Sequence, residues 1–125
     1  MRTNFCKTFG IEHPVVLAPM AGVVSDALVA AVSNAGGLGL APLWHVNADE
    51  LRESVRNIRR LTDKPFGVNL NMEFPSMEHL DACLEEGVEI ISLFWQAPGA
   101  FLAHAQSGGA KVIYSAGNAA DAKAV

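Results

Sequence analysis

The feature that most constrains the fold is a regular alternation of short apolar runs with segments of helical periodicity. Each apolar run is too short for a helix, rich in Val, Ile and Leu, and bounded by Gly or Pro, which predicts a buried strand. The strands expected on this basis are Pro14–Ala18, Leu38–Ala41, Phe66–Leu70, Val88–Phe94 and Lys111–Ser115. They recur roughly every 22 to 28 residues, a spacing typical of βα units joined by short loops.

Helix-start signals follow each predicted strand. Ser25, Ser76 and Asn118 are favoured N-cap residues, Asn47 with Glu50 forms a capping-box pattern, and Pro98 suits a first helical turn. Glycines at 36–37, 87 and 108–109 are expected to end the helices that precede them. The inward faces expected of two of these helices are Leu28, Ala31, Val32 and Ala35 in one, and Met77, Leu80, Cys83 and Leu84 in the other.

Strands without clean polar alternation indicate a parallel sheet covered by helices. Two architectures fit, a TIM (β/α)₈ barrel and a doubly wound open sheet. The Gly-rich stretch Gly36–Gly39 precedes a strand and is no dinucleotide fingerprint, which favours the barrel. A barrel of this kind closes with eight strands, and five would leave two open edges. We therefore expect an incomplete barrel of about five βα units, with residues 1–125 forming its N-terminal part.

Composition limits the classes of function. The chain has 125 residues, 50% of them hydrophobic and 18% charged, with a net charge of −4, which indicates one globular domain. The basic residues between Arg52 and Arg60 share one helix and indicate a solvated face, so nucleic acid is not expected as a partner. No apolar run reaches membrane-span length and residues 1–7 lack the apolar core of a signal peptide. Cys6 and Cys83 have no metal-type spacing, and the expectation is a cytoplasmic protein without membrane contact.

Three blocks of the sequence resemble the nitronate monooxygenase (2-nitropropane dioxygenase) family in order and spacing. They are Thr8–Val23, Leu28–Gly39 and Glu50–Leu70. FMN-dependent enoyl reductases of fatty-acid synthesis share the same blocks, so the resemblance is more specific for the family than for the substrate. It implies a TIM barrel that binds FMN at the carboxyl-terminal mouth of its strands and oxidises alkyl nitronates with O₂ to a carbonyl compound and nitrite. The implied partners are a small-molecule nitronate and O₂.

The resemblance also implies which residues contact the cofactor. Ala18, Pro19 and Met20 close the first predicted strand and would lie against the isoalloxazine ring, where Met offers a polarizable surface. Asn69 follows Val68 near the end of the third predicted strand, and a buried amide there must satisfy both its donors and its acceptor. Ser115 ends the fifth, at a position where some relatives carry Lys.

Other polar and aromatic residues have less specific interpretations. His45, Trp95 and Gln96 follow predicted strands and could line the pocket, although loop residues more often pack or stay solvated. His79 and His104 fall on predicted helices and are expected to be structural. The family's catalytic base follows the sixth strand, and its FMN phosphate loops follow strands seven and eight. No catalytic residue or metal ligand is assigned, and weak or no FMN retention is expected from this chain alone.

Alternatives remain within and beyond this family. An enoyl-ACP reductase or an NADH:quinone reductase would use the same barrel and FMN. A non-catalytic half-barrel would instead bury its open edges against a second copy, as a homo-oligomer, or against a complementary half. A TIM-barrel lyase or isomerase without flavin fits the strand pattern as well.

Overall fold

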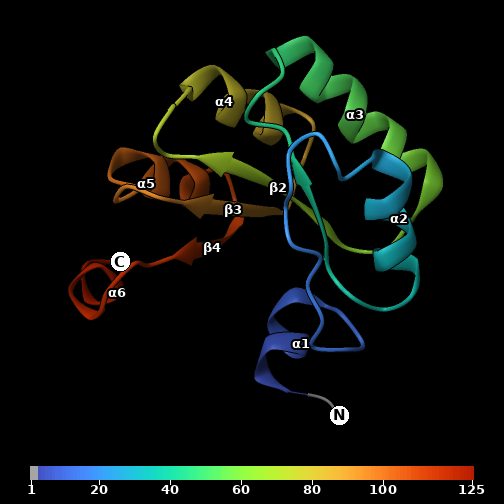
Figure 1. The fold of residues 1–125 in the computed structure, drawn as a ribbon, viewed down its shortest axis with the longest axis horizontal. Coiled ribbons are helices and arrows are strands. Elements are labelled where there is room, and N and C mark those ends of the chain that lie inside the picture. Colours follow the sequence, from blue (N-terminus) through green and yellow to red (C-terminus); the bar gives the residue numbers. More distant parts are fainter. Residues whose placement is uncertain (1–2) are drawn as a thin grey trace.

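A computed structural model describes residues 3–125 as a single parallel β-sheet with helices on both sides (Figure 1). Within these residues the sheet has four strands in the order β1-β2-β3-β4, every neighbouring pair parallel. The strands are β1 (Gly39–Pro42), β2 (Phe66–Asn71), β3 (Ile90–Phe94) and β4 (Lys111–Ser115). The parallel βα order confirms the fold class expected from the sequence, an incomplete α/β barrel.

The helices from α2 to α6 follow the predicted order, and α1 is an additional short helix. They are α1 (Asn4–Phe9), α2 (Asp26–Asn34), α3 (Ala48–Leu61), α4 (Met77–Glu85), α5 (Ala100–Ser107) and α6 (Ala119–Ala124). Neighbours from α2 to α5 pack side by side on one face of the sheet, whereas α1 lies apart from this layer (Figure 1). The predicted caps at Ser25, Ser76 and Asn118 accept backbone hydrogen bonds, and Asn47 with Glu50 completes a capping box. Residues 3–125 include no helix long and apolar enough to cross a bilayer.

The two faces of the sheet bury different clusters. On β2, Phe66, Val68 and Leu70 point toward the helix layer and join the larger core. On the opposite face, Leu40 of β1 and Ile90 of β3 belong to a smaller cluster. That smaller cluster also contains residues of α1 and its C-terminal turn: Cys6, Phe9 and Ile11. Strand alternation therefore gives the sheet a helix-covered face and a second face, which is the interior side of a barrel.

The prediction of a first strand at Pro14–Ala18 is corrected by the structure. This segment forms one isolated parallel bridge, Val16 to Leu38, beside β1, and Val15 and Val16 are 58% and 40% exposed. Its backbone is hydrogen-bonded to Leu38 on one side, through the Leu17 amide and the Val15 carbonyl. A pleated strand gains stability from pairing and from burial, and this segment has little of either. The apolar β-branched run predicted the position of this segment correctly, but it predicted a longer strand than the single bridge that forms.

Two predicted inward faces also need correction. Helix α2 buries Val29, Ala30 and Ser33, while Leu28 is 39% exposed. The reason is the close approach of α2 to β1, where a Cβ on Gly39 would lie 2.3 Å from the Val29 carbonyl oxygen. Helix α4 buries Leu80 and Cys83 as expected, but Met77 in its first turn is 39% exposed. Periodicity located both helices, and the packing of neighbouring elements fixed their rotation.

Candidate functional site

The interior face of the sheet changes from apolar to polar along the strand direction. Its amino-terminal row contains Leu40 and Ile90, which are buried. The next row, read across the strand register from β1 to β4, is Pro42, Asn69, Ser92 and Ile113. The carboxyl-terminal row places Asn71, Phe94 and Ser115 side by side. Polar side chains therefore gather at the carboxyl ends of the strands, where the active sites of this architecture are built.

Asn69 is the centre of this polar region. It is 2% exposed, and its Nδ2 donates to the Ser92 hydroxyl at 3.0 Å and to the Ser92 carbonyl oxygen at 3.4 Å. Its Oδ1 is buried and meets no hydrogen-bond donor among residues 3–125. A buried acceptor left unpaired costs about 1–3 kcal/mol, so it needs an explanation in a native structure. A ligand that supplies a donor to this oxygen is one such explanation.

The predicted contact segment Ala18–Met20 lies beside β1. Because the Val16–Leu38 bridge is parallel, the chain after Val16 runs toward the carboxyl end of β1 (Figure 1). Pro19 is half-buried and Met20 is 45% exposed. The Met20 carbonyl oxygen accepts from the amides of Val23 and Val24, at 3.1 and 3.0 Å, and closes the loop. The thioether is thus presented at the same end of the sheet as Asn69, although the structure describes no direct contact between the two.

Ser115 occupies the far end of this rim. It ends β4, lies in register with Phe94 of β3, and is exposed. Strand β3 lies between Ser115 on β4 and Asn69 on β2, and Ser115 shares the row of Asn71. The sequence placed it correctly at the carboxyl end, on the outermost described strand.

The sequence analysis did not assign two interior residues to the site. Ser92 is 4% exposed and lies in register with Asn69, and Asn71 is 4% exposed with its Oδ1 accepting from the Glu73 amide at 2.9 Å. Asn71 stands two positions after Asn69 and must share its face, because strand side chains alternate. That signal was present in the sequence, whereas the pairing of Ser92 with Asn69 needed the strand register.

Aromatic residues line the loops that follow the strands. Trp44 after β1 stacks on Phe74 after β2, with ring centroids 5.9 Å apart and planes 11° apart, and His45 packs edge-on against Trp44. Trp95, directly after β3, is 63% exposed and has φ of 73°, a left-handed backbone that is rare for a bulky residue. The Tyr114 hydroxyl donates to the Trp95 carbonyl oxygen at 3.2 Å. Gln96 beside it is exposed.

Two of the histidines expected to be structural make local contacts. His79 contacts the Ser76 hydroxyl and the Val46 carbonyl oxygen through its two ring nitrogens, which ties α4 to the loop before α3. His104 of α5 lies 2.7 Å from a carboxylate oxygen of Asp81 on α4. Both therefore connect elements of the helix layer. Cys6 and Cys83 are free, buried thiols.

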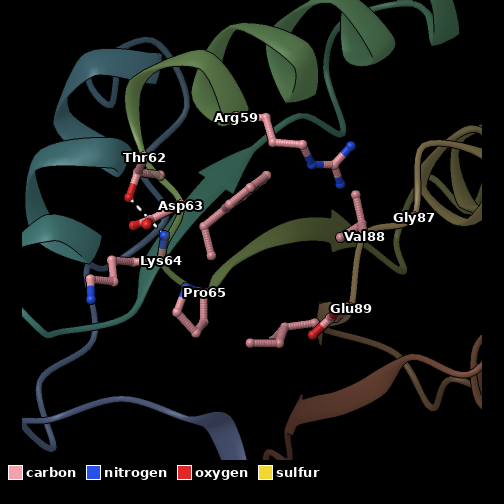
Figure 2. Close-up of a pocket in the computed structure, with 10 residues that line it drawn as sticks. Arg59, Thr62, Asp63, Lys64, Pro65, Gly87, Val88 and Glu89 are labelled. Carbon is pink, nitrogen blue, oxygen red and sulfur yellow. Dashed lines mark hydrogen bonds between the residues drawn. The ribbon is translucent and has the colours of Figure 1, made fainter.

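A cavity of about 300 Å³ lies at the opposite end of the sheet (Figure 2). It opens around the turn that joins α3 to β2 and the segment before β3, with Arg59, Lys64 and Glu89 among its lining residues. The Lys64 amide donates to the Thr62 hydroxyl within that turn, at 3.1 Å. This is the amino-terminal end of the strands, where conserved structure in barrels supports stability rather than chemistry. None of the predicted cofactor contacts lines it.

Comparison with known proteins shows which family the chain resembles. A model of the family described as nitronate monooxygenase matches residues 2–91. The chain belongs to the nitronate monooxygenase family. Over 89 residues, 71% of this chain, it is 46% identical to the nitronate monooxygenase of Paraburkholderia phytofirmans, and over 70 residues it is 50% identical to that of Pseudomonas aeruginosa. It is also 36% identical over 126 residues to a Mycobacterium tuberculosis protein, (3aS,4S,5R,7aS)-5-hydroxy-7a-methyl-1-oxo-octahydro-1H-indene-4-carboxyl-CoA dehydrogenase.

Solved structures of related proteins agree with this family assignment. FabK from Thermotoga maritima superposes with a TM-score of 0.95 at 33% identity, and covers 99% of this nitronate monooxygenase-family chain. A nitroalkane oxidase from Streptomyces ansochromogenes superposes with a TM-score of 0.81 at 25% identity. The chain spans 36% of the Mycobacterium tuberculosis protein and 40% of the FabK chain. The four described strands thus correspond to a portion of each relative's length.

Proposed function

We propose that this chain forms part of the cofactor-binding mouth of an FMN-dependent oxidoreductase that converts alkyl nitronates and O₂ to carbonyl compounds and nitrite. The observation that carries the proposal is the unpaired, buried Oδ1 of Asn69 on the barrel-interior face. Membership of the nitronate monooxygenase family supports the reaction class.

The residues of this rim suit a flat heterocycle with a polar edge. Asn69 offers an acceptor that is already desolvated, so a ligand donor gains a hydrogen bond without further loss of hydration. Met20 and the exposed indole of Trp95 offer polarizable surface at the same end of the strands. When bound, FMN would supply the capacity to accept electrons from the substrate. The chain's own residues would bind the ring, orient it and limit the access of water.

The phosphate anchor and the base are not assigned to residues of this chain. In the family that the sequence resembles, the oxidation of alkyl nitronates uses a His in a Gly-Gly-His loop. Residues 3–125 contain no such motif. His45 is exposed next to the Trp44 ring, and no described contact orients it as a base. The role proposed here is therefore ring binding.

A reductase of the same family is a second candidate. It is favoured by the TM-score of 0.95 with FabK and by the match, over the whole chain, to a carboxyl-CoA dehydrogenase. Both kinds of enzyme would use the same ring-binding wall. They differ in what delivers electrons to the flavin and what removes them.

The test is a purified protein assayed for bound flavin and for both reactions. The visible absorption bands of flavin, released on denaturation and identified as FMN, support the shared part of the proposal. Nitrite formed from propyl-2-nitronate and O₂ supports the monooxygenase. NADH oxidation that depends on an enoyl thioester or a quinone, without nitrite formation, supports the reductase and refutes the monooxygenase. A protein that binds no FMN when the cofactor is added in excess refutes both.

A further inference from the structure

We infer that Ser92 is a positioning residue which fixes the orientation of the Asn69 amide, so that the site presents a hydrogen-bond acceptor and selects the N3–H edge of the flavin ring. This inference rests on the proposed function, because it names which atom of the flavin the site recognises. Neither the family resemblance nor the reaction requires Ser92 to have this role.

The orientation of the amide follows from the two groups that face its nitrogen. The Ser92 carbonyl oxygen lies 3.4 Å from Nδ2, and a carbonyl oxygen can accept but never donate. The Ser92 hydroxyl oxygen lies 3.0 Å from the same nitrogen and accepts there. Reversing the amide would set Oδ1 against the carbonyl oxygen of Ser92, which is repulsive. Ser92 thus holds the nitrogen toward β3 and leaves Oδ1 as the free group.

The free group decides which ligand atom fits. An amide oxygen accepts hydrogen bonds and cannot donate them. Along the polar edge of an oxidised isoalloxazine, the two carbonyl oxygens are acceptors and N3–H is the donor. Asn69 Oδ1 is therefore complementary to N3–H and repels the flanking carbonyls. Since Asn69 is 2% exposed, the rim side chains over it must move aside when the ring binds.

The neighbours of Ser92 in the same row offer its hydroxyl few other hydrogen-bond partners. Its neighbour in register on β4 is Ile113, an apolar residue, so its hydroxyl has no polar side-chain partner there. Ser92 itself is 4% exposed, and a buried hydroxyl on a strand is costly unless it is hydrogen-bonded. The bond to Asn69 accounts for its presence.

The experiment compares lumiflavin with 3-methyl-lumiflavin, which differs by replacement of the N3 hydrogen. Both lack the ribityl phosphate, so ring recognition is measured without the phosphate anchor. Dissociation constants are determined by fluorescence quenching for the unaltered protein, Ser92→Ala, Ser92→Thr and the control Ser33→Ala. Ser33 is another buried serine, and its hydroxyl accepts from the Gly39 amide at 3.2 Å on the helix side of β1. Far-UV circular dichroism verifies that each variant is folded.

The expected result is that N3 methylation weakens binding about tenfold or more in the unaltered protein. Ser92→Ala should weaken this preference, because only the more distant Ser92 carbonyl, 3.4 Å from Nδ2, would then hold the Asn69 amide, whereas Ser92→Thr and Ser33→Ala should keep it. Equal affinity for both ligands in the unaltered protein overturns the inference and leaves the flavin proposal standing. A preference that is unchanged in Ser92→Ala overturns the positioning role of the Ser92 side chain. No lumiflavin binding in any protein refutes the proposed function instead.

Discussion

The amide of Asn69 and the hydroxyl of Ser92 meet across two adjacent parallel strands, 3.0 Å apart, on a sheet face that is apolar toward its amino-terminal end. The contact satisfies the nitrogen of Asn69 and leaves its oxygen buried without a donor. An apolar pair would avoid that cost. We interpret the retained polar pair as a stability cost associated with ligand binding, as is common at functional sites.

The double variant Asn69→Leu with Ser92→Ala tests this interpretation. Replacing both partners by apolar groups removes an unpaired buried acceptor, so the free energy of unfolding should stay equal or rise by about 1 kcal/mol. Lumiflavin binding should be lost at the same time. Urea unfolding followed by circular dichroism gives the first quantity, and fluorescence titration gives the second. A loss of more than about 2 kcal/mol, beyond the usual range for such swaps, would show that the pair is structural.

Gly39 provides a test of the packing that positions β1. A Cβ there would lie 2.3 Å from the Val29 carbonyl oxygen and 2.8 Å from the Val29 Cγ1 atom, so backbone would have to move. Gly39→Ala should lower the free energy of unfolding by about 3 kcal/mol, the upper range for overpacking. Gly117→Ala is the matched control, because its nearest neighbour would be 3.9 Å away. Similar thermal midpoints for the two variants would contradict the described contact.

Much of the fold could be predicted from the sequence because strand and helix signals are local. The strand Lys111–Ser115 and the caps at Ser25 and Ser76 were expected from residue type and spacing and are confirmed. The short helix α1 was not predicted, since six residues give too little periodicity to detect. The segment Pro14–Ala18 has strand composition, but composition does not report how many partners a strand finds.

The site was predictable in position and not in its contacts. Parallel strands bring their carboxyl ends to one edge, so Met20, Asn69 and Ser115 could be assigned to a common end from the order of elements. The bond between Asn69 and Ser92 depends on register, which one sequence does not specify. The left-handed backbone of Trp95 had no sequence signal either, because the usual residues for that conformation are Gly and Asn.

The Arg56–Glu86 ion pair predicts an acid-dependent link between α3 and α4. Arg56 donates to both carboxylate oxygens of Glu86, at 3.1 and 2.5 Å, and this contact lowers the pKa of Glu86 below its usual value of 4.5. A lowered carboxyl pKa stabilises the folded state above the unfolded pKa, and this stabilisation is lost as pH falls through the folded pKa. Because Arg56 is largely exposed, solvent screens the pair and its effect on stability should be small.

Glu86→Gln should therefore be less stable than the unaltered protein at pH 7 and equally stable well below pH 4.5. Glu53→Gln, an exposed position on α3, serves as the control and should show no such dependence. Urea midpoints measured across this pH range give the comparison. A difference that is unchanged at acid pH would mean that Glu86 acts through packing rather than charge.

The Cys83 thiol should be chemically inert in the folded protein, and its burial should make the protein less stable in alkali. Burial raises the pKa of its thiol from 9.0 to about 12, so the folded chain binds the proton more tightly than the unfolded chain. The stabilisation is complete below pH 9 and is lost as pH rises toward 12, at up to about 1.4 kcal/mol per pH unit. Cys83→Ala should flatten this alkaline decline. At neutral pH a thiol reagent should label Cys83 at the rate of global unfolding, and rapid labelling would contradict its burial.

Trp95 combines backbone strain with an exposed aromatic ring at the proposed mouth. Its left-handed φ of 73° costs a non-glycine residue roughly 1–2 kcal/mol. Trp95→Ala and Trp95→Gly both remove the indole and its contact with the Phe94 ring, and only glycine also removes the strain. Trp95→Gly should therefore be about 1 kcal/mol more stable than Trp95→Ala in urea unfolding. If the indole covers a bound ring, both variants should bind lumiflavin equally weakly, because affinity follows the lost side chain and stability follows the backbone. Affinity that instead matches the unaltered protein would assign Trp95 to a structural turn.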